Sequence, residues 1–198
     1  QADRGVAANL SGTGGCMSTH SVLDELPGDL MMWVLIISEL LVFGAGLAAF
    51  SAMRATDPAG FASAQAVLNS TAAGINTIVL VTSGLFAALA VAVRERGQRA
   101  RARVLLGLAA VLGFAFLWIK SAEYADKAEL GIGWDTHPFF TFYYLLTGFH
   151  AAHVVAGIVI LLLVMWRDAP RNIEIGAAFW HMVDLVWVLL FPVIYLLR

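Results

Sequence analysis

Five nearly unbroken apolar runs limit how this 198-residue chain can fold more than any other feature of the sequence. The runs cover residues 30–50, 74–93, 104–119, 139–166 and 176–197. Among the Asp, Glu, Lys and Arg residues, only Glu39 and Asp184 fall inside them. A helix of about 20 residues, rising about 1.5 Å per residue, crosses the roughly 30 Å hydrocarbon layer of a bilayer. The sequence therefore predicts an all-α polytopic membrane protein with five transmembrane helices.

The composition excludes several other classes of protein. Hydrophobic residues make up 60% of the chain and charged residues 13%, which does not fit a soluble globular domain. The single cysteine, Cys16, excludes an internal disulfide and a cysteine-rich metal site. Five arginines crowd residues 94–103, between two predicted spans. They indicate membrane topology and contact with anionic headgroups, and we expect no nucleic-acid partner.

The distribution of basic residues predicts the orientation of the chain. Eight Lys and Arg residues lie in the N-terminal tail and in the second and fourth connections between spans, against four on the opposite side. Basic residues near the ends of spans favour the cytoplasmic side of the membrane. The N-terminus is therefore predicted in the cytoplasm and the C-terminus on the outer, periplasmic side.

The sequence predicts one membrane domain, residues 27–198, after a mobile polar tail, residues 1–26. We expect Met17 to be the natural start of the chain, Asp29 to cap the first transmembrane helix and Pro192 to bend the last one. The helical pattern continues past the third apolar run, which indicates a helix that protrudes from the bilayer. Aromatic residues at the start of the fourth span suit an interfacial belt. They are Phe139, Phe140, Phe142, Tyr143 and Tyr144.

Polar side chains inside the apolar runs are the candidate functional residues. A charged group near the bilayer centre costs at least about 2.5–3.5 kcal/mol, so such groups are normally paired, protonated or turned toward protein or water. Glu39 lies close to the predicted midplane of the first span. His150 and His153 are three residues apart and share a face of the fourth span. His181 and Asp184 share a face of the fifth span in the same way.

These groups have structural interpretations beside the functional ones. Glu39 is either a protonated acid that holds helices together by hydrogen bonds or a proton-handling group. His150 and His153 either hydrogen-bond neighbouring helices or bind a metal together with Glu39 or Glu123.

The aromatic residues of the fifth span have a similar pair of interpretations. Trp180, Asp184 and Trp187 form one stripe along the predicted helix. Trp180 and Trp187 therefore line a packing surface or a lipid-binding cleft more often than a cofactor site.

Four segments resemble the signature of subunit III of haem–copper oxidases, the cytochrome c oxidase family. The segments are Ile37–Glu39, Ser121–Tyr124, Thr147–Val154 and Trp180–Trp187. Thr-Gly-Phe-His-x-x-His, followed one span later by Trp-His-x-Val-Asp-x-Val-Trp, is highly specific, and the length is similar to the five-helix bacterial form. The Leu-Pro-Gly-Asp-Leu start at residues 26–30 most resembles the branch associated with nitric oxide reductase, the activation protein of the denitrification cluster.

The resemblance implies a V-shaped cleft between helix bundles that binds phospholipid. It implies docking on a catalytic haem-containing subunit in the bacterial inner membrane, and support of that subunit's assembly, stability or turnover. Haem, with copper or non-haem iron, is then expected only in the partner, and no cofactor or metal in this chain. Glu39 corresponds to an intramembrane carboxylate that reacts with carbodiimides. Glu123 lies in one of the matching segments, and Glu174 also occupies a family position.

Three classes of function follow from these observations. The first is a non-catalytic accessory subunit of a respiratory haem–copper oxidase or nitric oxide reductase. The second is a stand-alone proton-coupled carrier that uses Glu39 and Asp184. The third is a membrane enzyme with its own haem or two-metal centre.

Overall fold

The structure, a computed structural model, describes residues 30–167 and 169–197. The expected N-terminal tail, the start at Met17 and the cap at Asp29 lie outside these residues. The described part contains six α-helices and one π-helical turn. Five of the helices are long and apolar enough to cross a membrane, which confirms the predicted fold class.

Short connections join the helices in chain order. The elements are α1 (Leu30–Thr56), α2 (Pro58–Ala66), α3 (Ser70–Glu95), α4 (Arg99–Glu129), α5 (Pro138–Arg167), α6 (Pro170–Phe191) and the π-helical turn η2 (Pro192–Leu196). The candidate spans are α1, α3, α4, α5, and α6 continued by η2. Helix α4 continues ten residues past residue 119, where the third apolar run ends, so the predicted continuation of this helix is confirmed.

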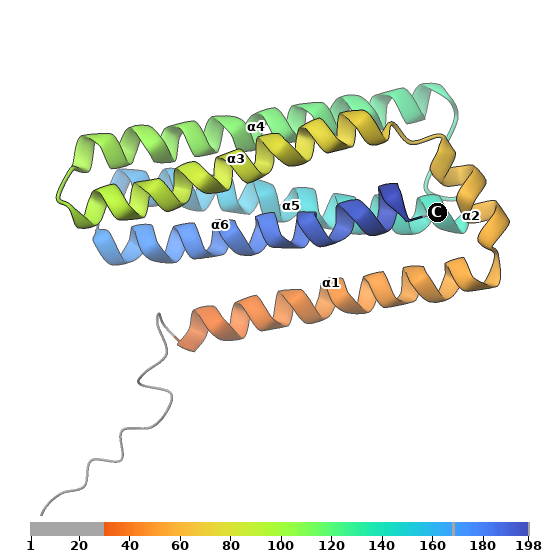
Figure 1. The fold of residues 1–198 in the computed structure, drawn as a ribbon, viewed down its shortest axis with the longest axis horizontal. Coiled ribbons are helices and arrows are strands. Elements are labelled where there is room, and N and C mark those ends of the chain that lie inside the picture. Colours follow the sequence, from red (N-terminus) through yellow and green to blue (C-terminus); the bar gives the residue numbers. More distant parts are fainter. Residues whose placement is uncertain (1–29, 168, 198) are drawn as a thin grey trace, which may run out of the picture.

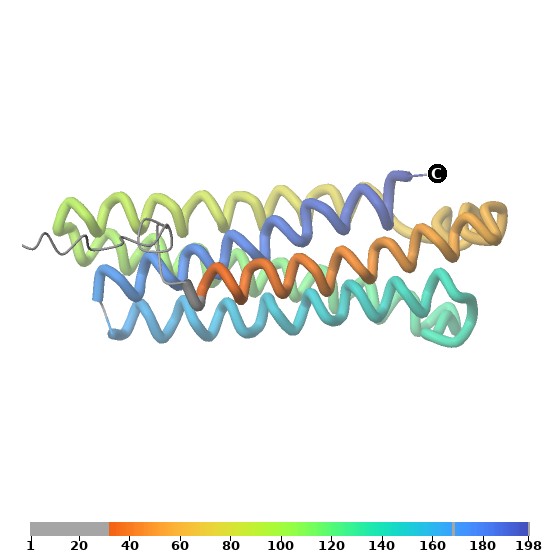
Figure 2. Tube along the Cα trace, turned by 90° about the horizontal axis from the view of Figure 1, so that it is seen from below, coloured from red at the N-terminus to blue at the C-terminus, as the bar shows by residue number. Residues whose placement is uncertain are grey.

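Four helices form a bundle in which each packs against two neighbours (Figures 1 and 2). Helix α3 packs against α4 and α6, and α5 packs against the same two helices. Helix α1 lies beside this bundle (Figure 1) and contacts α5 and α6. Among the five spans, α1 is the single helix that lies outside the four-helix bundle. A V-shaped cleft filled with lipid between α1 and the bundle stays a prediction.

Local signals begin and end the helices. Asp57 Oδ1 accepts a hydrogen bond from the Gly60 N–H at 3.0 Å, and Pro58 occupies the first turn of α2. Helix α2 is not predicted from the sequence, because nine residues are too few to show an apolar period. Gly97 and Gly131 follow the ends of α3 and α4 with φ of 76° and 70°, a left-handed conformation that glycine adopts without strain.

Trp180 of α6 lies at the centre of the bundle. Its side chain is fully buried, and its indole N–H donates to Ser83 Oγ of α3 at 3.0 Å. Glycines on the two remaining helices make room for the ring. A Cβ atom at Gly113 of α4 or Gly157 of α5 would lie 2.7 or 2.6 Å from the indole. This core position therefore depends on residues from all four helices.

Three of the five aromatic residues at the start of α5 belong to the core, so the expected interfacial belt is wrong for these three. Phe139, Phe140 and Tyr143 are buried. The Phe139 ring packs against Phe50 of α1 at 5.8 Å and against Phe61 of α2 at 5.7 Å between centroids. Helix α2 and the end of α1 therefore cover aromatic side chains that would otherwise face the membrane interface.

Candidate functional site

The polar residues predicted inside the membrane lie in separate places. Glu39 of α1 and His153 of α5 face each other at the seam between these two helices. His150 lies inside the four-helix bundle. His181 and Asp184 of α6 lie against α3. The structure therefore offers several small polar groupings and no single constellation of all five residues.

The seam between α1 and α5 contains the closest contact of Glu39. Its Oε2 lies 3.1 Å from His153 Nε2, and the two side chains are 23% and 16% exposed. His153 Nδ1 lies 2.9 Å from the Phe149 carbonyl oxygen, one helical turn back. The rings of Phe43 and Phe149 flank the imidazole at 5.7 and 4.6 Å. This contact joins α1 to the bundle inside the apolar part of the helix.

The imidazole ring of His150 packs against aromatic rings. It is fully buried, with ring centroids 5.6 Å from Phe116 of α4 and 5.0 Å from Trp187 of α6. Neither ring nitrogen has a hydrogen-bond partner in the structure. The interhelical hydrogen bond expected of His150 is therefore not formed, because aromatic side chains occupy the neighbouring positions.

His181 and Asp184 do share a face of α6. Asp184 Oδ2 lies 3.9 Å from His181 Nδ1, and the side chains are 10% and 46% exposed. Gly84 of α3 lets the carboxyl group approach the helix backbone, since a Cβ there would overlap Asp184 Oδ2. Asp184 Oδ1 is buried without a hydrogen-bond partner. The carboxyl group therefore fills the contact between α3 and α6.

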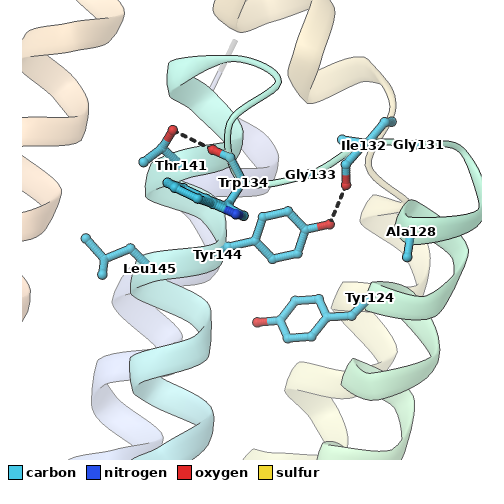
Figure 3. A pocket seen from close by; sticks show the side chains of 9 residues that line it. All are labelled: Tyr124, Ala128, Gly131, Ile132, Gly133, Trp134, Thr141, Tyr144 and Leu145. Carbon is cyan, nitrogen blue, oxygen red and sulfur yellow. Dashed lines mark hydrogen bonds between the residues drawn. The ribbon is translucent and has the colours of Figure 1, made fainter.

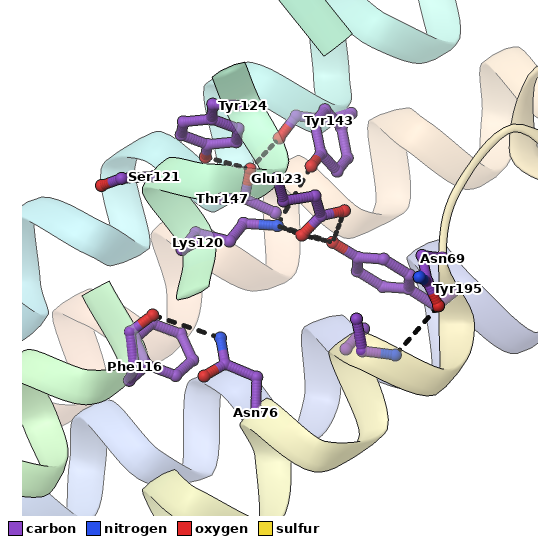
Figure 4. A network of polar contacts seen from close by, with 12 residues as sticks. Asn69, Asn76, Phe116, Lys120, Ser121, Glu123, Tyr124, Tyr143, Thr147 and Tyr195 are labelled. Carbon is purple, nitrogen blue, oxygen red and sulfur yellow. Dashed lines mark hydrogen bonds and ion pairs between the residues drawn. The ribbon is translucent and has the colours of Figure 1, made fainter. Parts of the chain in front are cut away.

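The most highly connected polar cluster is centred on Lys120, a residue that the sequence analysis does not single out (Figure 4). Lys120 is 2% exposed. Its Nζ donates to Glu123 Oε2 at 2.9 Å, to Tyr143 OH at 3.1 Å and to Tyr195 OH at 2.5 Å. Tyr195 OH in turn donates to Glu123 Oε1 at 2.9 Å. The cluster joins α4, α5 and η2.

Aromatic rings surround the Lys120 ammonium group. It lies between 4.7 and 5.3 Å from the ring centroids of Tyr124, Tyr143, Trp187 and Tyr195. Cation–π attraction is strongest when the cation is desolvated, so the rings help offset the cost of removing an ammonium group from water. Lys120 follows the third apolar run directly, and its spacing from Glu123 and Tyr124 on one helical face was the available sequence signal.

Side chains from three other elements bond the carbonyl groups at the C-terminal end of the described chain. The pairs are Gln65 with the Ile194 oxygen, Ser70 with the Tyr195 oxygen and Arg54 with the Leu197 oxygen. The α-helical pattern ends before Pro192, and the Leu197 N–H donates to the Pro192 oxygen at 2.9 Å in a wider π turn. At Pro192, where the sequence predicts a bend, the structure shows a change from α- to π-helix. The freed carbonyls are bonded from α1, α2 and α3.

The structure places Trp180 and Trp187 inside the bundle, where they are 0% and 1% exposed. The Trp187 indole N–H donates to Thr77 Oγ1 of α3 at 2.9 Å. Neither indole reaches the outer surface of the bundle. Both are therefore packing residues, and the alternative of a lipid-binding cleft at these two side chains is wrong.

Glu174 lies near the beginning of α6, away from the other predicted site residues. It is exposed and lines, with Arg94, Glu95 and Arg171, a hollow of about 170 Å³. Two acidic and two basic side chains meet at this hollow. The mixture of charges gives no preference for an anionic or a cationic ligand.

A larger hollow, of about 870 Å³, opens between the end of α4 and the start of α5 (Figure 3). Tyr124, Trp134, Tyr144 and Leu145 line much of it. The Tyr144 hydroxyl donates to the Ile132 carbonyl oxygen at 3.0 Å and so fixes the connection between the two helices. The lining is largely apolar, and it carries no carboxylate, amine or imidazole.

The candidate metal ligands lie in separate parts of the structure. No group of three or more His, Cys, Asp and Glu side chains in residues 30–167 and 169–197 is arranged to hold a metal ion. His153 faces Glu39, whereas His150 packs against Phe116 and Glu123 bonds Lys120. The proposed ligand set of two histidines with Glu39 or Glu123 is therefore not brought together.

Comparison with known proteins gives a consistent result along the whole chain. The sequence model of the family described as "Cytochrome c oxidase subunit III" matches residues 9–198. "Cytochrome c oxidase subunit 3" of Thermostichus vulcanus is 32% identical over 182 residues, which cover 85% of this chain and 86% of that protein.

Two further relatives support the match. "Cytochrome c oxidase subunit 3" of a Synechocystis strain is 29% identical, covering 85% of this chain and 76% of that protein. "Probable cytochrome c oxidase subunit 3" of Mycobacterium bovis is 27% identical, covering 97% and 98%. Five apolar helices, the family match over residues 9–198 and these relatives define a polytopic respiratory membrane subunit. The chain belongs to the subunit III family of haem–copper oxidases.

Proposed function

We propose that this chain is a non-catalytic accessory subunit that supports the assembly, stability or turnover of a catalytic haem-containing subunit. The match to subunit III over nearly the full chain carries this proposal. The arrangement of polar groups agrees with it, because Glu39, Glu123 and Asp184 each lie against side chains of this chain. Haem, and copper or non-haem iron, then belong to the partner.

The partner is proposed to be a nitric oxide reductase of a bacterial inner membrane. The support is the Leu-Pro-Gly-Asp-Leu segment at residues 26–30, which lies largely outside the described residues. The curated relatives are named for cytochrome c oxidase, so an oxygen-reducing partner is the competing outcome. Identifying the haem protein that copurifies with this chain separates the two.

Phospholipid binding is proposed at the hollow between α4 and α5 rather than at the buried tryptophans. Its largely apolar lining, with Trp134 69% exposed beside it, suits an acyl chain at the membrane interface. Lipid analysis of the purified complex tests this. Loss of a retained phospholipid in Tyr144→Ala, with retention in the control Phe114→Ala, an aromatic residue that is 55% exposed on α4, is the expected result.

The orientation is proposed from the basic residues, with the N-terminus in the cytoplasm. The connection from α3 to α4 and the beginning of α1 lie at the same end of the structure (Figure 1). A reporter inserted at Gly97 should therefore be cytoplasmic and a reporter after Arg198 periplasmic. Both reporters on one side would contradict this orientation.

A stand-alone proton carrier gains no support from the structure. Glu39 lies at the contact between α1 and α5, while Asp184 lies at the contact between α3 and α6. The apolar runs of all five spans are continuous α-helices up to Phe191, whereas many carriers bind substrate at broken helices near the midplane.

Paired membranes with and without this chain test the accessory role. The catalytic subunit should keep its haem and its initial rate without this chain, but it should lose activity sooner during sustained turnover or accumulate to a lower level. Equal yield and equal lifetime in the two membranes would contradict the proposal.

A further inference from the structure

Residues 192–197 contact both the four-helix bundle and the two helices outside it, α1 and α2, which together we call the arm. The bundle holds this segment by its side chains. Ile194 and Tyr195 are 0% and 2% exposed. Tyr195 OH accepts a hydrogen bond from Lys120 Nζ at 2.5 Å and donates one to Glu123 Oε1 at 2.9 Å (Figure 4). The position of the segment is therefore set by α4.

The backbone carbonyl groups of the same segment bond the arm. Gln65 of α2, which is buried, donates its amide N–H to the Ile194 oxygen at 3.0 Å. Arg54, near the end of α1, donates to the Leu197 oxygen. Hydrogen bonds are directional, so each of these two bonds constrains how the helix that supplies the donor lies against the segment.

The end of the helical structure leaves these carbonyls in need of partners. Carbonyl groups in the last turn of a helix have no partner within that helix, and a buried carbonyl without a partner is costly. Besides Gln65 and Arg54, the donor is Ser70, the first residue of α3, whose hydroxyl bonds the Tyr195 oxygen at 3.3 Å. Two of the three donors thus belong to the arm.

Aromatic packing attaches the arm on its other side, along α5. Phe50 of α1 packs against Phe61 of α2 and Phe139 of α5, with ring centroids 5.5 and 5.8 Å apart. Among the described side chains of α1, only Phe43 and Phe50 are buried. Apolar burial is not directional, so these rings attach the arm without fixing its angle to the bundle.

The polar contacts of the arm outside residues 192–197 also lie on the α5 side. Glu39 Oε2 lies 3.1 Å from His153 Nε2 of α5. Asp57 Oδ2 lies 3.4 Å from His137 Nε2, just before α5, and this pair is largely exposed, at 55% and 27%. The arm is thus held along α5 on one side and by the extension of α6 on the other.

We propose that residues 194–197 form a clasp, anchored in the bundle by side chains, whose carbonyl groups fix the arm and limit the opening between α1 and the bundle. The clasp follows α1 to α6 in the sequence. The arm can therefore be fastened only after all five spans have been synthesised. This inference goes beyond the accessory role and holds whichever catalytic subunit the chain joins.

Pulsed electron paramagnetic resonance of the full chain in phospholipid nanodiscs tests the clasp. Cys16→Ser removes the natural cysteine, and spin labels on new cysteines at Leu41 of α1 and Ile78 of α3, each 68% exposed, report the distance from the arm to the bundle. A second pair, at Ile78 and at Val155 of α5, reports a distance within the bundle and serves as the reference.

The test variant is Arg54→Met with Gln65→Leu, which removes both donors but keeps side chains of similar size. The matched control is Ser51→Ala with Ser63→Ala. These serines lie on the same two helices, are exposed, and bond the Leu47 and Gly60 oxygens of their own helices.

We expect one narrow distance for both label pairs in the unsubstituted chain and in the control. In the test variant the distance from the arm to the bundle should become broadly distributed, while the reference distance stays narrow. A narrow, unchanged distance from the arm to the bundle would overturn the proposal. Broadening of both distances would also overturn it, because residues 194–197 would then hold the bundle itself. If the double variant does not fold, Gln65→Leu alone is measured against Ser63→Ala, and the same results decide.

Discussion

Helices α1 and α6 have nearly the same mean hydropathy but very different surroundings. Their most apolar windows have mean hydropathies of 2.1 and 1.9, yet 11% of the α1 window and 50% of the α6 window is buried within the described chain. Helix α6 packs against α3 and α5 and contacts α1, whereas α1 touches one side of the bundle. Hydropathy thus identifies a helix that crosses a membrane, but it does not report what the helix packs against.

The difference arises from side-chain shape and polarity. Helix α6 fits Trp180 against glycines and places Asp184 over Gly84, and its extension η2 brings Tyr195 to Lys120. Helix α1 offers mainly large aliphatic side chains to the outside, among them Leu41, which is 68% exposed. We therefore expect substitutions near α6 to affect stability more than substitutions on α1.

The largest expected effect is at Lys120. Lys120→Met leaves Glu123, whose side chain is 10% exposed, without its cation. Removing one partner of a buried ion pair costs about 3–5 kcal/mol, so the free energy of unfolding in detergent micelles should fall by about that amount. Ser121→Ala is the control, because Ser121 is exposed and bonds only the Leu117 oxygen of its own helix. Equal effects of the two substitutions would contradict the importance of the cluster.

The sequence alone predicts the five spans, but it does not predict which polar side chains contact each other. The apolar runs determine the spans because burial in lipid requires them. The sequence does not single out Lys120, because it lies one residue beyond an apolar run and its partners Tyr143 and Tyr195 come from other helices. His150 and His153 share a face in sequence, yet packing encloses the first and leaves the second at a seam. Such distinctions depend on where neighbouring helices lie.

A smaller effect is expected at Gly157, where α5 meets the indole of α6. A Cβ there would lie 2.6 Å from Trp180, and overpacking a core typically costs about 1–3 kcal/mol. Gly157→Ala should lower the unfolding temperature. Gly148→Ala on the same helix should not, because nothing lies within 4 Å of its Cβ position. Similar losses at both positions would contradict the close packing of Gly157 against Trp180.

The smallest effect on stability is expected at Glu39. Interhelical polar contacts in membranes average about 0.6 kcal/mol, so Glu39→Ala should destabilise the chain by about that amount and Glu39→Gln by less. Ser38→Ala serves as the control, since Ser38 bonds the Leu35 oxygen within α1. A loss at Glu39→Ala as large as that at Lys120→Met would remove the contrast between the two regions.

Glu39→Gln also separates a structural role from proton transfer in the assembled complex. The amide keeps the size of the side chain and can hydrogen-bond His153. We expect the complex to assemble and turn over at the normal rate. A complex that assembles fully but turns over several-fold more slowly would instead assign Glu39 to proton handling.

Purification of the tagged chain from its native membrane, with optical spectra before and after separation of the subunits, tests the accessory role most directly. The account predicts that a haem-containing catalytic subunit copurifies with this chain and that the haem absorption stays entirely with that subunit. Stoichiometric haem on the separated chain, or purification without any haem protein, would contradict it.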